Sequence, residues 1–187
     1  MSEGKRSWAS MQIIARIAMI AAAVALVAAF FLPWASADDE FRDAAVRFPD
    51  TMFYEPAGMT ATDACDLSLA EYAQVYGSMG DASQAWTLYM AIMYATLGAS
   101  VLALVLSAAG KPVGGAVFAL ATLGISRLLV WDFGDRGVLP NGTHDWGIAP
   151  TIYLLGAIAL IAAAVWLLVL KRQAGAQSSA EAERMAA

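Results

Sequence analysis

The chain has 187 residues, of which 60% are hydrophobic and only 14% are charged, and its formal net charge is -5 at pH 7. This composition excludes an ordinary soluble domain and an intrinsically disordered chain, because both carry more charge and fewer apolar residues. The acidic balance also excludes the basic surface that nucleic-acid binding needs. The single cysteine, Cys65, excludes an internal disulfide framework.

The apolar residues fall into four blocks, at about 13–34, 85–109, 113–133 and 148–170. Each block reaches about 20 residues, the length that crosses ~30 Å of hydrocarbon as a helix. We therefore predict an all-α, polytopic membrane protein, an antiparallel bundle of four transmembrane helices. Residues 1–170 form this single domain in the prediction.

The end of the first block has two interpretations. Ala35-Ser36-Ala37 is the small-x-small pattern that signal peptidase cuts, so the chain could be cleaved after Ala37. Alternatively the block is a retained membrane anchor. Its apolar run, residues 17–32, is slightly longer than the usual signal core of about 7–15 residues. A stripe of small residues, suited to close helix packing, also favours retention: Ala18, Ala22, Ala25 and Ala29.

The loop at residues 35–84 is strongly acidic and is predicted to lie outside the cytoplasm. Within it, LSLAEYAQVY predicts a short amphipathic helix that Asp66 or Ser68 caps. Its apolar face is expected to carry Leu69, Tyr72, Val75 and Tyr76. This helix is either a lid on the bundle or part of a docking surface for an extracytoplasmic partner.

The second and third helices are expected to form a tight hairpin. Asp81 or Ser83 can cap the start of the second helix. Gly110-Lys111-Pro112 supplies a glycine stop and then a proline suited to the first turn of the next helix.

Arg127 is the residue that fits lipid least, because it lies inside the third predicted helix. The second helix runs the opposite way, so Tyr89 and Tyr94 are expected at similar depths. Their hydroxyls, or the carboxylates of Asp132 and Asp135, could receive the guanidinium. Arg127, Tyr89, Tyr94 and Asp132 are therefore the candidate ligand or partner site. The alternative is that Arg127 reaches up to the headgroups or to Asp132 as a structural residue.

The remaining segments carry no strong site signal. His144 is the only histidine, in the short loop 134–147, and zinc sites usually need several nitrogen or sulfur ligands. We predict neither a metal nor a cofactor. Residues 171–187 are alanine-rich and polar, and they are expected to form a flexible or weakly helical cytoplasmic tail.

The basic residues predict the orientation. With four crossings they all fall on one side, which the positive-inside rule makes cytoplasmic: Lys5, Arg6, Arg16, Lys111, Lys171 and Arg172. Four tryptophans are expected near the opposite boundary, where amphipathic rings prefer the headgroup level: Trp34, Trp86, Trp131 and Trp146. We therefore predict a multi-pass protein of the inner membrane of a bacterium, with both termini on the cytoplasmic side.

The first helix ends in Phe31-Leu32-Pro33-Trp34, and LSLAEYAQVY and the stretch from Gly147 to Tyr153 follow later. In these features the chain resembles small uncharacterised bacterial four-helix membrane proteins with FLPW at the end of the first helix. The long first and short second outer loops are also similar to the layout of claudins. The claudin W-G-L-W…C…C signature is absent, since only Cys65 is present.

No sequence pattern typical of a catalytic site occurs, neither C-x-x-C, H-E-x-x-H nor G-x-S-x-G. We therefore predict a non-enzymatic membrane protein, an accessory, assembly or binding subunit. Its expected partners are the lipid bilayer and a membrane or extracytoplasmic protein, with no nucleic acid, and a homo-oligomer stays open. The alternative function is a small oligomeric transporter or channel with a polar site around Arg127.

Overall fold

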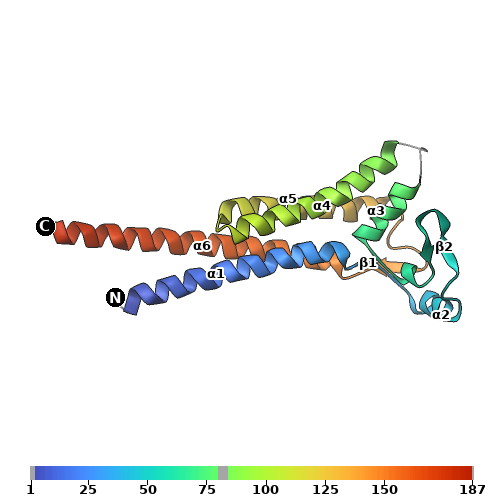
Figure 1. Ribbon diagram of the computed structural model, residues 1–187, viewed down its shortest axis with the longest axis horizontal. Helices are drawn as coiled ribbons and strands as arrows, with labels where there is room; N and C mark the ends of the chain where they lie inside the picture. Colours follow the sequence, from blue (N-terminus) through green and yellow to red (C-terminus); the bar gives the residue numbers. More distant parts are fainter. Residues whose placement is uncertain (1–2, 80–83, 187) are drawn as a thin grey trace.

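The computed structural model describes residues 3–79 and 84–186 and is mostly helical (Figure 1). Four long helices lie side by side: α1 (Glu3–Ala28), α4 (Gln84–Ala108), α5 (Pro112–Asp135) and α6 (Ala149–Ala186). All four are long and apolar enough to cross a membrane. Their apolar cores match the four predicted blocks. The residues predicted as a tail, 171–187, continue α6 as helix to Ala186.

Glycine and proline end one helix and begin the next at the α4–α5 turn, as predicted. Gly110 has a φ of 70°, the left-handed conformation that favours glycine, and its N–H donates to the Ser107 carbonyl at 3.0 Å. Pro112 is the first residue of α5. The start of α4 cannot be compared in the same way, because the predicted caps Asp81 and Ser83 lie outside the described residues.

The helices pack through small and hydroxyl side chains, although not always the predicted ones. Ala22 of α1 and Ala29, which begins the short 3-10 helix Ala29–Phe31 after α1, are buried as expected, whereas Ala18 is exposed. In α4 the buried face carries Thr96 and Ser100, whose hydroxyls donate to carbonyls four residues back in the helix. These contacts pair the two buried hydroxyls and allow close packing, whereas the buried Ser107 hydroxyl of α4 has no hydrogen-bond partner among the described residues.

Residues 32–79 and 136–148 fold into a second layer, here called the cap, at the end of the bundle opposite the termini (Figure 1). It contains two further helices, α2 (Asp39–Arg47) and α3 (Leu69–Ser78). It also contains five short strands: β1 (Pro33–Ala37), β2 (Met52–Tyr54), β3 (Met59–Thr60), β4 (Asp66–Ser68) and β5 (His144–Trp146). The all-α prediction therefore describes the bundle and misses the β structure of the cap.

The first helix runs directly into the central strand of the cap. The three-stranded sheet has the order β4-β1-β5, and both pairings are antiparallel. Ala35-Ser36-Ala37, the motif with two interpretations, lies in this central strand, where Ala35 faces Trp146 and Ala37 faces His144. The chain segment that could be a cleavage site is thus hydrogen-bonded on both sides in the folded protein.

Trp34, the second residue of β1, is completely buried rather than placed at the surface. Its ring lies 6.0–6.4 Å from the rings of Phe133, Trp146 and Tyr153, which come from α5, β5 and α6. The prediction that Trp34 contacts the lipid headgroups is therefore wrong. Trp131, by contrast, is 68% exposed on α5.

The amphipathic lid helix forms as predicted, as α3. Of the two candidate caps, Ser68 is the one used: its hydroxyl accepts from the Glu71 N–H, and Glu71 Oε2 accepts from the Ser68 N–H at 2.7 Å. Leu69, Tyr72 and Tyr76 are buried, and Val75 is partly buried. This face packs against the bundle, mainly on α4.

An ion pair fastens α2 to the sheet. The Arg42 guanidinium donates to both Asp66 carboxylate oxygens, at 2.7 and 3.0 Å, and the Ser36 hydroxyl donates to the same carboxylate at 2.7 Å. The hydrogen bonds from Arg42 lower the pKa of Asp66 below its ordinary value of 3.8. Ionised Asp66 therefore stabilises the cap at every pH above that value.

This pKa shift predicts how stability depends on pH. The contribution of Asp66 is fully present above pH 3.8 and is lost as the pH falls through the lower pKa of the folded state. We expect Asp66→Asn to lower stability at neutral pH by at most about 1 kcal/mol, because the pair is partly exposed. The apparent Tm of the detergent-solubilised chain, followed from neutral to acid pH, measures both effects. Asp50→Asn, another exposed cap carboxylate, is the control, and an equal effect of the two substitutions would contradict the assignment.

A second prediction concerns the tight contact between β1 and the start of α6. A Cβ at Gly147 would lie 2.2 Å from the Pro33 carbonyl oxygen, whereas one at Gly142 meets nothing within 4 Å. Gly147→Ala must displace the backbone, and we expect a loss of about 1–3 kcal/mol. The apparent Tm of this variant should fall clearly below that of Gly142→Ala. Equal Tm values would show that the contact is not tight.

Candidate functional site

The structure divides the predicted site residues among three places. Arg127 contacts the start of α6, and Tyr94 is 48% exposed on α4 with its ring 5.8 Å from that of Phe30. Tyr89 and Asp132 do meet, since the Tyr89 hydroxyl donates to Asp132 Oδ1 at 3.3 Å. Tyr89 and Asp132, each predicted as a possible partner of Arg127, thus contact each other, whereas Arg127 and Tyr94 lie elsewhere.

Arg127 ties α5 to α6. One guanidinium nitrogen, Nη2, donates to the Pro150 carbonyl at 2.6 Å, and Nε is buried without a hydrogen-bond partner among the described residues. The predicted partner Asp132 is five residues further along α5, which is about 140° around the helix. The two residues are therefore about 7.5 Å apart along the axis and on different faces of the helix. For this reason the prediction of a contact between them is wrong.

The carboxylate of Asp132 binds Arg136 instead. Arg136 Nε and Nη2 both donate to Asp132 Oδ2, at 2.9 and 2.5 Å. Nη2 also donates to the Tyr76 hydroxyl of α3 at 3.2 Å, and the guanidinium carbon lies 4.2 Å from the centre of the Tyr89 ring. These four residues join α3, α4 and α5, and we call them the latch.

The latch is held by charge as well as by geometry. Burial opposes the charged form of Arg136, but its hydrogen bonds to Asp132 and Tyr76 outweigh this and raise its pKa. Burial also raises the pKa of Tyr76, whose hydroxyl stays protonated. A cation over an aromatic face that also binds a carboxylate is favourable when it is partly desolvated. The latch therefore fixes the lid helix on the bundle.

The spacing of Asp132 and Arg136 is a sequence signal for the latch. Asp132 and Arg136 are four residues apart, the spacing at which opposite charges meet on a helix surface. The apolar block predicts that this helix ends at residue 133, which leaves Arg136 in the loop 134–147. The structure continues α5 to Asp135, so Arg136 reaches back to Asp132.

His144 is a structural residue of the cap, buried in β5. Its Nε2 lies 2.8 Å from the Ala64 carbonyl oxygen, which can only accept, so Nε2 carries the proton. Nδ1 shares a hydrogen bond of 2.9 Å with the Thr143 hydroxyl. Both nitrogens are therefore in use. Within the described part of the chain, no group of three or more histidine, cysteine or acidic residues could hold a metal ion.

Comparison with known proteins finds no match: no protein-family model, no curated protein and no solved structure is similar to this chain. The resemblance based on the FLPW segment stays a prediction, and the site must be interpreted from its own geometry.

The latch predicts a local change in dynamics. Arg136→Met removes the bonds to Asp132 and Tyr76, and we expect α3 to open more often, by about 1–2 kcal/mol or roughly 5–30-fold. Hydrogen exchange of the backbone amides of residues 69–78 measures this opening. Asp135→Asn, at the exposed neighbouring position, is the matched control. Unchanged exchange in Arg136→Met would show that the lid is held without the latch.

Proposed function

We propose that the protein is a multi-pass inner-membrane protein of a bacterium that presents its cap outside the cytoplasm to bind another protein. In this proposal it is a non-catalytic accessory or assembly subunit. The orientation is supported by charge. Arg16, Lys111, Lys171 and Arg172 belong to the end of the bundle from which the termini project, and the cap carries most of the acidic residues.

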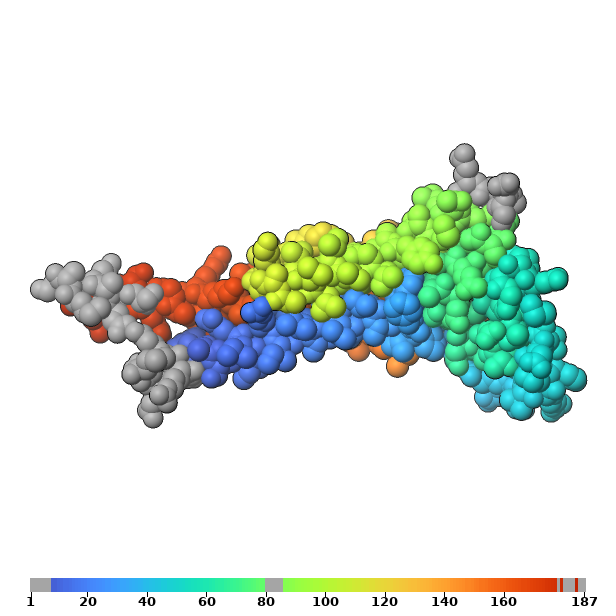
Figure 2. Space-filling model, in the orientation of Figure 1, coloured from blue at the N-terminus to red at the C-terminus, as the bar shows by residue number. Residues whose placement is uncertain are grey.

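The observation that carries the proposal is an apolar surface of the cap, away from the four long helices. Four side chains of one continuous cap segment, residues 46–53, are between 49% and 80% exposed: Val46, Phe48, Met52 and Phe53. The segment begins at the end of α2 and ends in β2, and Figures 1 and 2 place both elements at the end of the cap opposite the termini. Lipid around the bundle does not explain apolar residues at this place. Exposed clusters of this kind mark protein contact surfaces.

The surroundings of this surface indicate the partner's chemistry. A cavity of about 240 Å³ lies beside it and is lined by Phe53, by Tyr72 and Val75 of α3 and by Met79, which follows α3. Such a cavity suits an apolar anchor residue of a partner. Asp43, Asp50 and Glu55 are exposed close by in the sequence. We therefore infer a protein partner with an apolar side chain flanked by lysine or arginine.

The polar clusters of the cap support binding rather than catalysis. Arg42 and Asp66 hold each other, the latch satisfies Arg136 and Asp132, and both nitrogens of His144 are hydrogen-bonded. These groups fix the shape of the cap, and a rigid surface binds with less loss of conformational entropy.

The second candidate function, an oligomeric transporter or channel, depends on Arg127. The buried Nε of Arg127 has no hydrogen-bond partner among the described residues, which a solute or a second copy of the chain could provide. The bond from Arg127 to the Pro150 carbonyl favours the structural role. Solute-dependent growth defects of Arg127→Leu would favour transport instead.

Photo-crosslinking in the native membrane tests the proposal. A photoreactive residue at Phe48 should give an adduct with a different polypeptide, and Phe53→Asp should reduce this adduct roughly tenfold or more if Phe53 is a binding hot spot. The same label at Trp131, equally exposed but on α5, is the control and should give lipid adducts. Only lipid adducts or only self-adducts from position 48 would contradict the proposal.

A further inference from the structure

A polar notch lies at the end of the bundle opposite the cap. The α4–α5 turn ends there, while α1 and α6 extend further (Figure 1). At this step a cavity of about 450 Å³ opens between α1, the turn and α6. The basic residues at this step, Lys111, Lys171 and Arg172, indicate that the bundle leaves the hydrocarbon here, at the level of the lipid headgroups.

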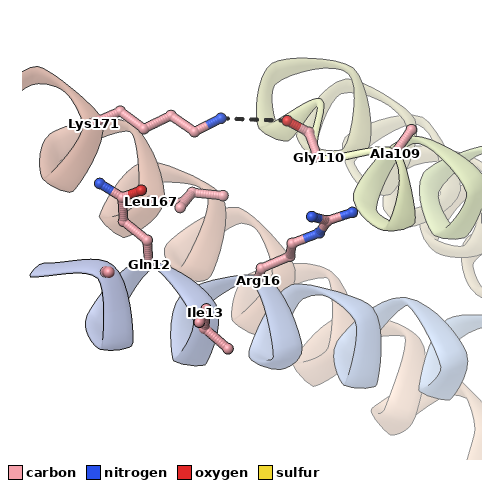
Figure 3. Close-up of a pocket in the computed structure, with 8 residues that line it drawn as sticks. Gln12, Ile13, Arg16, Ala109, Gly110, Leu167 and Lys171 are labelled. Carbon is pink, nitrogen blue, oxygen red and sulfur yellow. Dashed lines mark hydrogen bonds between the residues drawn. The ribbon is translucent and has the colours of Figure 1, made fainter. Parts of the chain in front are cut away.

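Two cations reach into this notch from opposite walls (Figure 3). Arg16 of α1 donates through Nη2 to the Ala108 carbonyl, and Lys171 of α6 donates to the Gly110 carbonyl at 3.4 Å. The Lys171 bond is long for an N–H···O contact, so this ammonium is weakly held. Both side chains are exposed, and a guanidinium has five N–H donors, of which this contact uses only some.

No carboxylate lies close in sequence to the two cations of the notch. Residues 4–37, 85–131 and 147–180 contain neither aspartate nor glutamate. The cations do face the carbonyls at the end of α4, which carry only partial negative charge. An anion that enters the notch is therefore attracted by two full charges.

Apart from the polar Gln12, the other side chains that line the notch are apolar or small, which indicates what kind of anion fits. Ile13 and Leu167 line the notch beside Arg16 and Lys171. Leu168, next along α6, lines a second cavity of about 240 Å³ between α5 and α6 whose other residues are also apolar. An anionic group next to apolar furrows at the headgroup level matches a phospholipid, and basic pockets between membrane helices bind such headgroups.

We propose that the notch binds the phosphate group of an anionic phospholipid, with Arg16 and Lys171 as its two cationic ligands. Arg16 can hold phosphate oxygens with paired N–H donors while keeping its bond to α4, and Lys171 adds a mobile point charge. The lipid then fills the step between the short hairpin and the two longer helices. This site is separate from the cap, so the proposal stands independently of the partner inferred above.

Native mass spectrometry of the purified full-length chain tests this proposal. The probes are phosphatidylglycerol and phosphatidylcholine with the same acyl chains. We expect phosphatidylglycerol to bind more tightly, and Lys171→Gln and Arg16→Gln each to weaken it about fivefold, the loss expected for one cation near an anionic lipid. Arg172→Gln, one residue from Lys171 and exposed, is the matched control and should keep the wild-type affinity.

Three results would overturn the proposal. Equal binding of the two lipids would exclude recognition of the anionic headgroup, and an equal effect of Arg172→Gln and Lys171→Gln would show diffuse surface charge. Displacement of the lipid by inorganic phosphate alone would show that the site takes free phosphate. Because Arg16 also donates to a carbonyl of α4, the Arg16→Gln variant must first show a wild-type Tm without lipid. If its Tm is lowered, the test rests on Lys171→Gln alone, since the bond from Lys171 is weak.

Discussion

The structure depends on the strand that follows the first helix. After Phe31 the chain becomes extended at Leu32 and enters β1, which lies between β4 and β5. The two outer strands come from the two separate segments of the cap. Because β1 is continuous with α1, the sheet is fixed to the bundle at its centre. The buried Trp34 ring, packed against side chains of α5, β5 and α6, fixes it a second time.

This constraint gives the two ends of the molecule different roles. At one end the latch and the Arg42–Asp66 pair hold the cap in a fixed shape, and residues 46–53 are the surface that we propose for partner binding. At the other end, helices of unequal length leave a notch whose two cations have weak or few partners. The charged side chains that are fully paired stabilise the fold of the cap, and the incompletely paired Arg16 and Lys171 are the candidates for ligand binding.

Local sequence signals predicted the bundle well, because each depends on residues close together in the chain. Helix lengths follow from apolar runs, the hairpin from Gly110 and Pro112, and α3 from the Ser68 and Glu71 capping pair. The sheet could not be predicted in this way. Its strands have three to five residues, too few for an alternating pattern, and β1 pairs with a strand more than one hundred residues away. The contact that Arg127 makes could not be predicted for a related reason: the sequence gives the depth of Arg127 in a helix, but its hydrogen-bond partner depends on which face of that helix meets which neighbour.

The intact mass of the mature chain, isolated from the membrane of its own host, tests the central claim most directly. If β1 is the centre of the cap, the first helix must remain covalently attached, and the account predicts a chain that retains α1 and β1. A mature chain that begins at Asp38 would contradict it, because cleavage after Ala37 removes β1 and leaves β4 and β5 without the strand that joins them.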